Sequence, residues 1–159
     1  MRSDAPQVIR ALLSRSPLTE EREAPIERVQ SACRVAADAL GLLAPPEWIL
    51  SGYPVDEDGE TTSIQWAADL GNAVLDLGEA MGSTAFEGRV RHLAHLMKAV
   101  QLPEGCWPVQ SNARTGAPVG PGRCAAEPLL LFNRLDSLQD STEFETAASL
   151  AAAWLVSGG

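Results

Sequence analysis

The sequence predicts an all-α protein made of tandem antiparallel helical hairpins, and three observations lead to this fold class. Residues 83–87 (STAFE) recur 58 positions later as residues 141–145 (STEFE), and apolar positions on both sides of this segment also match. Apolar residues follow a helical period over most of the chain. Alternating β-branched runs never exceed a few residues, so strand signals are nearly absent. A fixed period of this length indicates a repeated pair of helices.

Six helices are expected, and local signals mark several of their starts. Thr84 and Thr142 each precede a glutamate by three residues, which is the spacing of a capping box that satisfies free amide groups at a helix start. Thr62 has the same relation to Gln65 and is a weaker example. Pro25 suits a first helical turn. The predicted helices span residues 5–14, 25–43, 63–81, 84–100, 126–139 and 143–157.

The connections between these helices alternate in length. Short turns at residues 82–83 and 140–141 make the helices on either side antiparallel neighbours. Two long connections, residues 44–62 and 101–125, hold seven of the 11 prolines. Loops of this length commonly bind a ligand or carry catalytic residues, although they can also simply cover the hairpin ends. We expect one domain over residues 1–159, in approximate units 1–62, 63–123 and 124–159, with the long connections gathered at one end.

The two helices of a hairpin differ in their surfaces. Residues 63–81 are apolar around most of the helix, which predicts an inner helix covered by several neighbours. Residues 84–100 have a narrow apolar stripe and a broad polar face, which predicts an outer helix. The narrow polar stripe of the inner helix consists of Gln65, Asp69, Asn72, Asp76 and Glu79.

Composition and charge exclude several classes of partner. The 159 residues include 12 basic and 21 acidic side chains, and the net charge of −9 argues against nucleic acid and anionic membrane surfaces as partners. No apolar run approaches the roughly 20 residues that span a bilayer, and residues 1–10 do not resemble a signal peptide. We therefore expect a cytoplasmic protein. Cys106 and Cys124 could form a disulfide in an exported protein, but reduced thiols are the simpler expectation.

Neither a cofactor nor a metal is expected. The sequence has no glycine-rich phosphate loop, no Gly-x-Ser-x-Gly segment and no CxxC motif. His92 and His95 are three residues apart on one predicted helix, a spacing that can hold a metal. No third ligand accompanies them on that helix, so we interpret them as a solvated pair.

A family resemblance enters through the second long connection. Residues 102–108 (LPEGCWP), 113–118 (ARTGAP) and 127–130 (EPLL) are similar to the inter-hairpin connections of six-hairpin glycosidase-like proteins and related polysaccharide lyases, which share an (α/α) toroid. The resemblance covers residues 63–157. It implies a partial (α/α) toroid and carbohydrate processing, by a glycoside hydrolase or a polysaccharide lyase. It carries over no catalytic motif.

The resemblance implies a ligand site at the N-terminal ends of the inner helices, where the long connections meet. Glycoside hydrolysis needs two carboxyl groups, for which Asp69 with Asp56 or Asp58 is the predicted pair. A lyase would use Tyr53 as the base and Arg114 to neutralise a uronate. Exposed aromatic rings beside polar groups suit a sugar. The predicted substrate-binding residues are Trp48, Trp66, Trp107, Asn112, Arg114 and Glu127.

Other interpretations remain open at this stage. The acidic run at residues 56–60 is also typical of a solvated turn. A closed ring of six hairpins would need more than twice this chain, so the chain is either a fragment of a longer toroid or a short array that covers its open ends by self-association. The alternative function is a non-catalytic helical-repeat module whose inner polar stripe binds a protein. A terpenoid-cyclase-like cavity is disfavoured by the 5% aromatic content.

Overall fold

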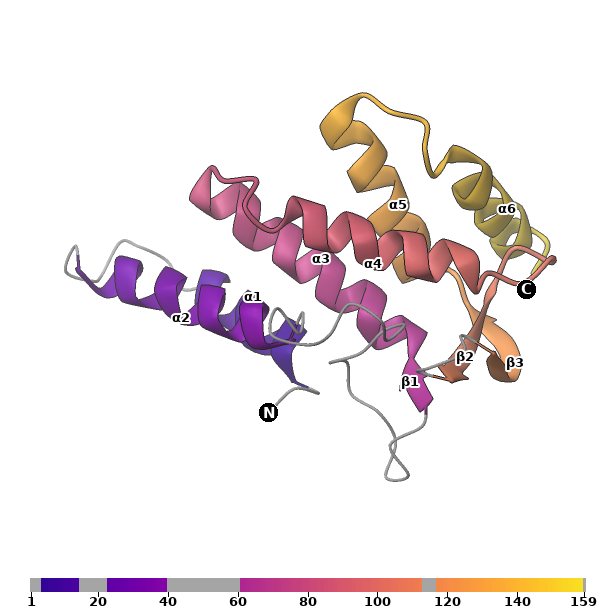
Figure 1. The fold of residues 1–159 in the computed structure, drawn as a ribbon, viewed down its shortest axis with the longest axis horizontal. Coiled ribbons are helices and arrows are strands. Elements are labelled where there is room, and N and C mark those ends of the chain that lie inside the picture. The colour runs from indigo at the N-terminus through magenta and orange to yellow at the C-terminus, as the bar shows by residue number, and fades with distance from the viewer. Residues whose placement is uncertain (1–3, 15–22, 40–60, 113–116, 159) are drawn as a thin grey trace.

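Helices dominate the fold (Figure 1). The computed structural model describes residues 4–14, 23–39, 61–112 and 117–158. The helices are α1 (Ala5–Ser14), α2 (Glu23–Ala39), α3 (Ile64–Met81), α4 (Glu87–Ala99), α5 (Ala126–Gln139) and α6 (Glu145–Val156). The strands are β1 (Thr61–Ser63), β2 (Trp107–Asn112) and β3 (Pro118–Cys124).

Each predicted helix has a counterpart in the structure. The predicted bounds of the first and fifth helices coincide with those of α1 and α5, and those of the third, fourth and sixth differ by no more than three residues at either end. The second helix begins at Glu23 and is described as far as Ala39, so the predicted residues 40–43 lie outside the described part of the chain. The prediction of a mainly helical protein is confirmed.

The expectation that strands are nearly absent is wrong. A three-stranded antiparallel sheet in the order β1–β2–β3 forms within the two long connections. Its sequences contain prolines and glycines in place of the usual alternating pattern, which is why the strand signal was weak. Pro108 lies where the β2–β3 register shifts, an irregularity that accommodates a residue without an amide proton. Gly122 packs so closely on Cys106 that a Cβ atom would lie 2.3 Å from its sulfur.

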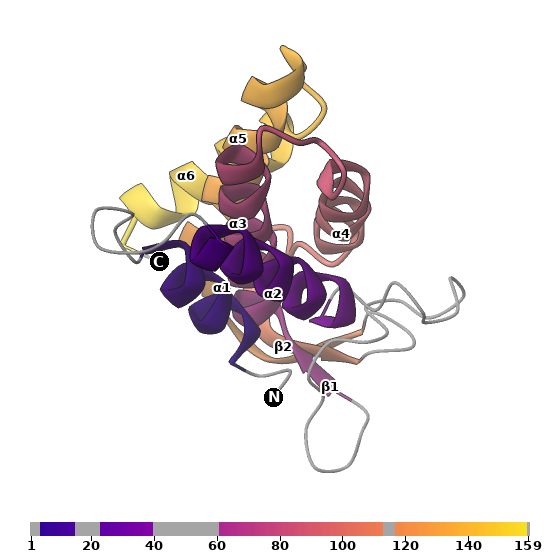
Figure 2. The same ribbon diagram turned by 90° about the vertical axis from the view of Figure 1, so that its left-hand side faces the viewer.

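The sheet joins the described ends of the two long connections. Thr61 of β1 pairs with Asn112 of β2, and β2 pairs in turn with β3. Because β1 leads directly into α3 and β3 leads into α5, the N-terminal ends of these two helices lie beside the sheet. Figures 1 and 2 show the strands gathered at one end of α3.

Helix α3 lies at the centre of the molecule. It packs against α1, α2, α4 and α5, and 10 of its residues are buried (Figure 2). Gly71 permits the closest of these approaches, because a Cβ atom there would come within 2.9 Å of the Leu131 side chain of α5. Helix α4 buries only Val90, Leu93, Ala94 and Met97, in agreement with the narrow apolar stripe expected for its sequence.

The turns after α3 and α5 have the same backbone form. Gly82 and Asp140 both adopt the left-handed conformation, with φ of 58° and 48°. In each turn the next amide reaches back to a carbonyl of the preceding helix, from Ser83 to Gly78 and from Ser141 to Asp136. These hydrogen bonds satisfy carbonyl groups at the helix ends.

The predicted capping boxes are wrong in detail. Helices α4 and α6 begin after Phe86 and Phe144, and neither helix has a side-chain cap. The cap of α3 is Ser63, whose hydroxyl accepts a hydrogen bond from the Trp66 amide at 3.2 Å, and not the predicted Thr62. The helix therefore begins one residue later than the threonine pattern indicated.

Candidate functional site

A pocket of about 290 Å³ lies at the N-terminal ends of α3 and α5, next to β1. Its lining comes from α1, from β1 and the first two turns of α3, and from the first turn of α5. Its lining residues are Gln7, Ser63, Gln65, Trp66, Asp69 and Glu127. This is the place in the fold where the sequence predicted a ligand site.

The pocket brings together three of the predicted site residues, Trp66, Asp69 and Glu127. Gln65 and Asp69 are four residues apart and therefore lie on the same side of α3. The Gln65 side-chain amide donates a hydrogen bond to Glu127 Oε1 at 3.0 Å, which links α3 to α5 across the pocket. The indole of Trp66 is half-buried and offers part of its surface to the pocket.

Asp69 is held in place from α1. Arg10 Nη2 donates to Asp69 Oδ1 at 2.6 Å, and Arg10 Nε lies 3.8 Å from Asp76 Oδ2. The hydrogen bond to Asp69 raises the pKa of the Arg10 guanidinium above its ordinary value, in spite of partial desolvation. This pair fixes the orientation of a carboxylate that lines the pocket.

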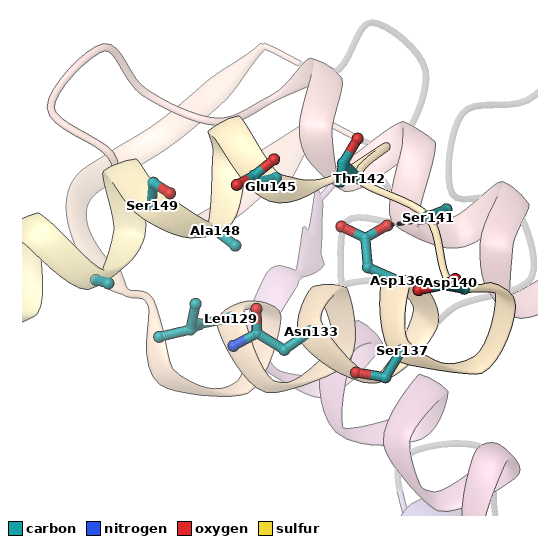
Figure 3. A pocket seen from close by; sticks show the side chains of 11 residues that line it. Leu129, Asn133, Asp136, Ser137, Asp140, Ser141, Thr142, Glu145, Ala148 and Ser149 are labelled. Atoms are coloured by element: carbon teal, nitrogen blue, oxygen red, sulfur yellow. Dashed lines mark hydrogen bonds between the residues drawn. The ribbon is translucent and has the colours of Figure 1, made fainter.

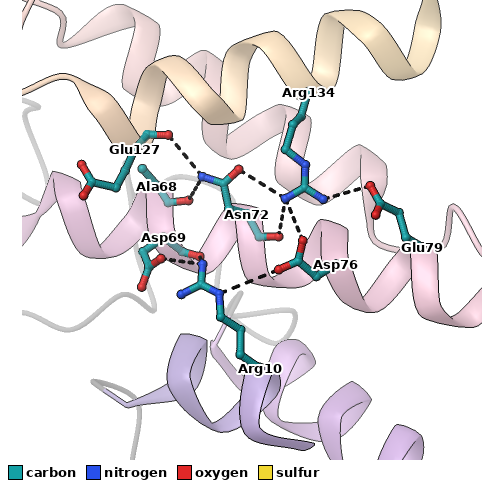
Figure 4. A network of polar contacts seen from close by, with 8 residues as sticks. All are labelled: Arg10, Ala68, Asp69, Asn72, Asp76, Glu79, Glu127 and Arg134. Atoms are coloured by element: carbon teal, nitrogen blue, oxygen red, sulfur yellow. Dashed lines mark hydrogen bonds and ion pairs between the residues drawn. The ribbon is translucent and has the colours of Figure 1, made fainter. Parts of the chain in front are cut away.

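Glu127 is positioned through its backbone. The buried Asn72 amide donates to the Ala68 carbonyl at 3.1 Å and to the Glu127 carbonyl at 3.2 Å. The start of α5 is thereby attached to the middle of α3. Figure 4 shows the Asp69 and Glu127 carboxyl groups on the same side of this network.

The polar stripe of α3 makes hydrogen bonds and ion pairs with neighbouring helices. Arg134 of α5 donates to the Asn72 carbonyl at 2.9 Å, and its guanidinium pairs with Asp76 at 2.9 Å and with Glu79 at 3.0 Å (Figure 4). Arg134 and Arg10 together connect the polar stripe to α5 and to α1. The stripe therefore connects α1, α3 and α5, and the alternative expectation that it binds a protein partner stays a prediction.

Trp107 does not belong to the pocket. Its side chain is fully buried, its Nε1 donates to the Met97 carbonyl at 2.8 Å, and its ring meets Phe132 edge-on at 5.5 Å between centroids. No ring face is left for a ligand, so this predicted substrate-binding residue is a core residue. Sequence reasoning missed this because the apolar helix faces that cover the start of β2 come together only when the chain folds.

Asn112 lies at the end of β2, opposite Thr61. Its backbone amide donates a hydrogen bond to the Ala117 carbonyl at 2.8 Å and so joins the two ends of the β2–β3 connection. It belongs to the sheet beside the pocket and not to the lining of the pocket. Its role in substrate binding stays a prediction.

Five predicted site residues lie outside the described part of the chain. They are Trp48, Tyr53, Asp56, Asp58 and Arg114. The predicted pairing of Asp69 with Asp56 or Asp58, and that of Tyr53 with Arg114, stay predictions for this reason.

Two lining residues of the pocket, Ser63 and Gln7, were not predicted, and neither was Arg10, which holds Asp69. Ser63 could have been found as the serine directly before an apolar helix. The seven-residue spacing of Asp69 and Asp76 signals a shared cation, although only the packing of α1 identifies it as Arg10. Gln7 has no signal in the sequence, because its position depends on how α1 docks.

Over the described ranges, no group of three or more His, Cys, Asp or Glu side chains could hold a metal ion. His95 Nε2 lies 3.0 Å from Glu143 Oε1, while His92 is exposed. Cys33 and Cys106 carry free thiols, and burial raises the pKa of both.

Comparison of the chain with protein-family models, with curated proteins and with solved structures finds no match. Among the helices that the structure describes, none combines the length and the apolar character that a membrane crossing requires.

Proposed function

We propose that the protein binds and processes a carbohydrate, as a glycoside hydrolase or a polysaccharide lyase, in the pocket between α3 and α5. One observation carries this proposal. An indole, two amides, a hydroxyl and two carboxyl groups line the same pocket, and they come from α1, the β1–α3 junction and α5. Sites that bind sugars need this combination, because sugar rings have apolar faces and polar edges.

Each group has a defined part in sugar binding. The exposed surface of Trp66 packs against the apolar face of a sugar ring. Ser63, Gln65 and Gln7 exchange hydrogen bonds with its hydroxyl groups. The pocket's volume of about 290 Å³ suits a single sugar unit, with adjoining units extending into solvent.

The two carboxyl groups supply the chemistry of a hydrolase. Asp69, paired with Arg10, acts as the ionised nucleophile or base. Glu127, which accepts a hydrogen bond from Gln65, donates the proton to the leaving oxygen. In this proposal Glu127 takes the place that Asp56 or Asp58 had in the predicted pair. A lyase mechanism would instead rest on Tyr53 and Arg114.

The architecture that we propose is part of an (α/α) toroid. Three consecutive helix pairs, α1–α2, α3–α4 and α5–α6, support it, as does the packing of α3 against both helices of the first pair and against α5 of the third. The sheet at the N-terminal ends of α3 and α5 supports a site at that end.

Glycan binding followed by an assay for released reducing ends, or for the absorbance of unsaturated uronates, tests this function. We expect Asp69→Asn and Glu127→Gln to abolish turnover while binding is retained, and Trp66→Ala to weaken binding. Glu104→Gln, a change at an exposed residue of the α4–β2 connection, is the matched control. Folded wild-type protein that neither binds nor cleaves any glycan would refute the proposal, and binding without turnover would refute its catalytic part.

A non-catalytic interaction module is the second candidate. The open groove between α5 and α6, described below, favours it. The two candidates do not exclude each other, because the pocket and the groove lie on different parts of the molecule.

A further inference from the structure

A groove of about 530 Å³ lies between α5 and α6 (Figure 3). It runs from the turn that joins the two helices toward their other ends. Leu129, Ala148 and Ala152 form its apolar floor, and Asp136, Asp140 and Glu145 contribute carboxyl groups. None of its lining residues is basic.

The corresponding groove, 58 residues earlier in the sequence, lies between α3 and α4. Helix α5 packs along it and leaves a smaller pocket of about 190 Å³ at its turn end, which Leu138 of α5 helps to line. Leu131 of α5 lies against Gly71 of α3. Near the other end of α5, the Gln139 side chain donates a hydrogen bond to Glu87 of α4. Arg91 of α4 donates to the Leu135 carbonyl at 3.2 Å.

Burial differs between the two grooves in the way that an absent helix would produce. Ala94 is fully buried, whereas its counterpart Ala152 is only half-buried. The Glu87 side chain is 14% exposed, whereas its counterpart Glu145 belongs to the exposed residues. The α5–α6 groove thus has the form of a helix-binding surface from which the helix is missing.

The charges of the groove indicate what kind of helix fits. The Asp136 carboxylate already accepts hydrogen bonds from the Ser141 hydroxyl at 2.8 Å and from the Phe144 amide. Asp140 and Glu145 face the groove at the same end. Glu145 corresponds to the glutamate that binds Gln139, so a donor side chain on the incoming helix would meet it. A positive charge at that position complements the acidic groove.

We infer that the α5–α6 groove binds a basic amphipathic helix of a protein partner, in the position that α5 takes in the α3–α4 groove. The helix presents apolar side chains at positions that correspond to Leu135 and Leu138, and a lysine or arginine toward Glu145. At the position of Leu131 it carries a small residue, because Leu129 stands where the earlier groove has Gly71. This is a helix-in-groove mode of recognition.

A designed peptide tests this inference. The probe is an N-acetylated, C-amidated, dye-labelled peptide of residues 126–139 with the changes Leu131→Ala, Asp136→Lys and Gln139→Lys, which give it a positive net charge. It is stapled to stay helical because short helices are marginal alone. Fluorescence anisotropy measures its binding to the full chain. We expect saturable binding that Ala152→Arg and Ser149→Arg each weaken by about tenfold or more.

Matched controls use neighbouring residues and the peptide itself. Ala153→Arg, on the exposed part of α6 outside the groove lining, changes the affinity by less than about twofold. A probe that also carries Leu135→Lys does not bind. Thermal unfolding of each protein variant shows whether it is folded. If Ala152→Arg does not fold, Ser149→Arg alone tests the groove.

Three results would overturn the inference. The first is the absence of saturable binding to folded protein, and the second is equal loss of affinity with Ala152→Arg and Ala153→Arg. The third is a concentration-dependent dimer, seen by sedimentation velocity, that Ala152→Arg dissociates. That dimer would make a second copy of this chain the occupant of the groove.

Discussion

Arg10 of α1 donates a hydrogen bond of 2.6 Å to Asp69 of α3, so the N-terminal helix is attached to the helix that contributes three of the six lining residues of the candidate site. The same guanidinium lies 3.8 Å from Asp76, about two helical turns further along α3. The docking of α1 and the orientation of a carboxylate in the pocket therefore depend on one side chain. This dependence leads to the first prediction.

Replacing Arg10 should affect the candidate site more than it affects the free energy of unfolding. We expect Arg10→Met to lower the free energy of unfolding by only about 0.5 kcal/mol, because both partners are partly exposed. Activity or glycan binding is expected to fall more than this small loss explains, since Asp69 loses its anchor. Urea unfolding and glycan titration measure the two effects, with Arg34→Met on the exposed side of α2 as the control. Equal effects of both variants on the site would contradict the prediction.

Asn72 is expected to matter more for stability than the ion pairs do. Its buried amide donates to two carbonyl groups, and Asn72→Ala leaves those groups without this donor. The expected loss is about 1–3 kcal/mol in the free energy of unfolding. Asn133→Ala, at an exposed position of α5, is the matched change and should cost little. Chemical denaturation compares the two variants directly.

Two glycines in helices should respond to alanine with opposite signs. Gly71→Ala places a methyl group within 2.9 Å of Leu131, and we expect it to cost about 1–3 kcal/mol by overpacking. Gly88→Ala meets open space in α4 and should gain about 0.5–1 kcal/mol from better helix propensity. Melting temperatures measured side by side would show the divergence, and a shift in the same direction for both would be inconsistent with this packing.

Replacing Trp107 should mainly lower stability, whereas replacing Trp66 should mainly weaken ligand binding. Trp107→Ala removes a fully buried ring and is expected to cost about 3–5 kcal/mol. Trp66→Ala removes a half-buried ring that lines the pocket, so it should weaken glycan binding with a smaller loss of stability. Calorimetry and glycan titration of both variants check this. A Trp66→Ala variant with unchanged binding to any glycan that the wild type binds would remove Trp66 from the site.

Stability should fall at alkaline pH in part because of Cys106. Burial raises the pKa of this thiol above its ordinary value of 9.0, so the folded chain holds the proton more tightly than the unfolded chain does. The contribution is complete below pH 9.0 and is lost as the pH rises through the pKa of the folded state. Cys106→Ala should therefore flatten the alkaline decline in the free energy of unfolding. Unfolding curves on either side of pH 9.0 test this, and an unchanged slope would contradict it.

The sequence predicted the helices better than the contacts between them. Period and repeat are local signals, and they located all six helices and the polar stripe of α3. The partners of that stripe, Arg10 and Arg134, come from other helices and could not be identified before the packing was known. Three lining residues of the pocket were predicted because they lie at the start of α3 or α5, which is a property of position along the chain.

The errors have physical causes as well. The strands contain proline and glycine where strands usually alternate, and they owe their form to pairing between distant segments. Trp107 was predicted to bind a ligand because it follows a loop, but the helices that surround it place it in the core. The cap of α3 was predicted one residue too early, because Thr62 and Ser63 both carry a hydroxyl group that can cap a helix.

The pairing of Thr61 with Asn112 joins two segments that are far apart along the chain. Closing so long a loop has a large entropic cost, so this contact should form late in folding, after the local helix pairs. The place of Ser63 in the pocket lining depends on it, because Ser63 is the last residue of β1 and leads directly into α3. Under mild denaturant the pocket should therefore open before the helices unfold. A ligand held in the pocket would slow hydrogen exchange at the amides of β1 and β2 more than anywhere else.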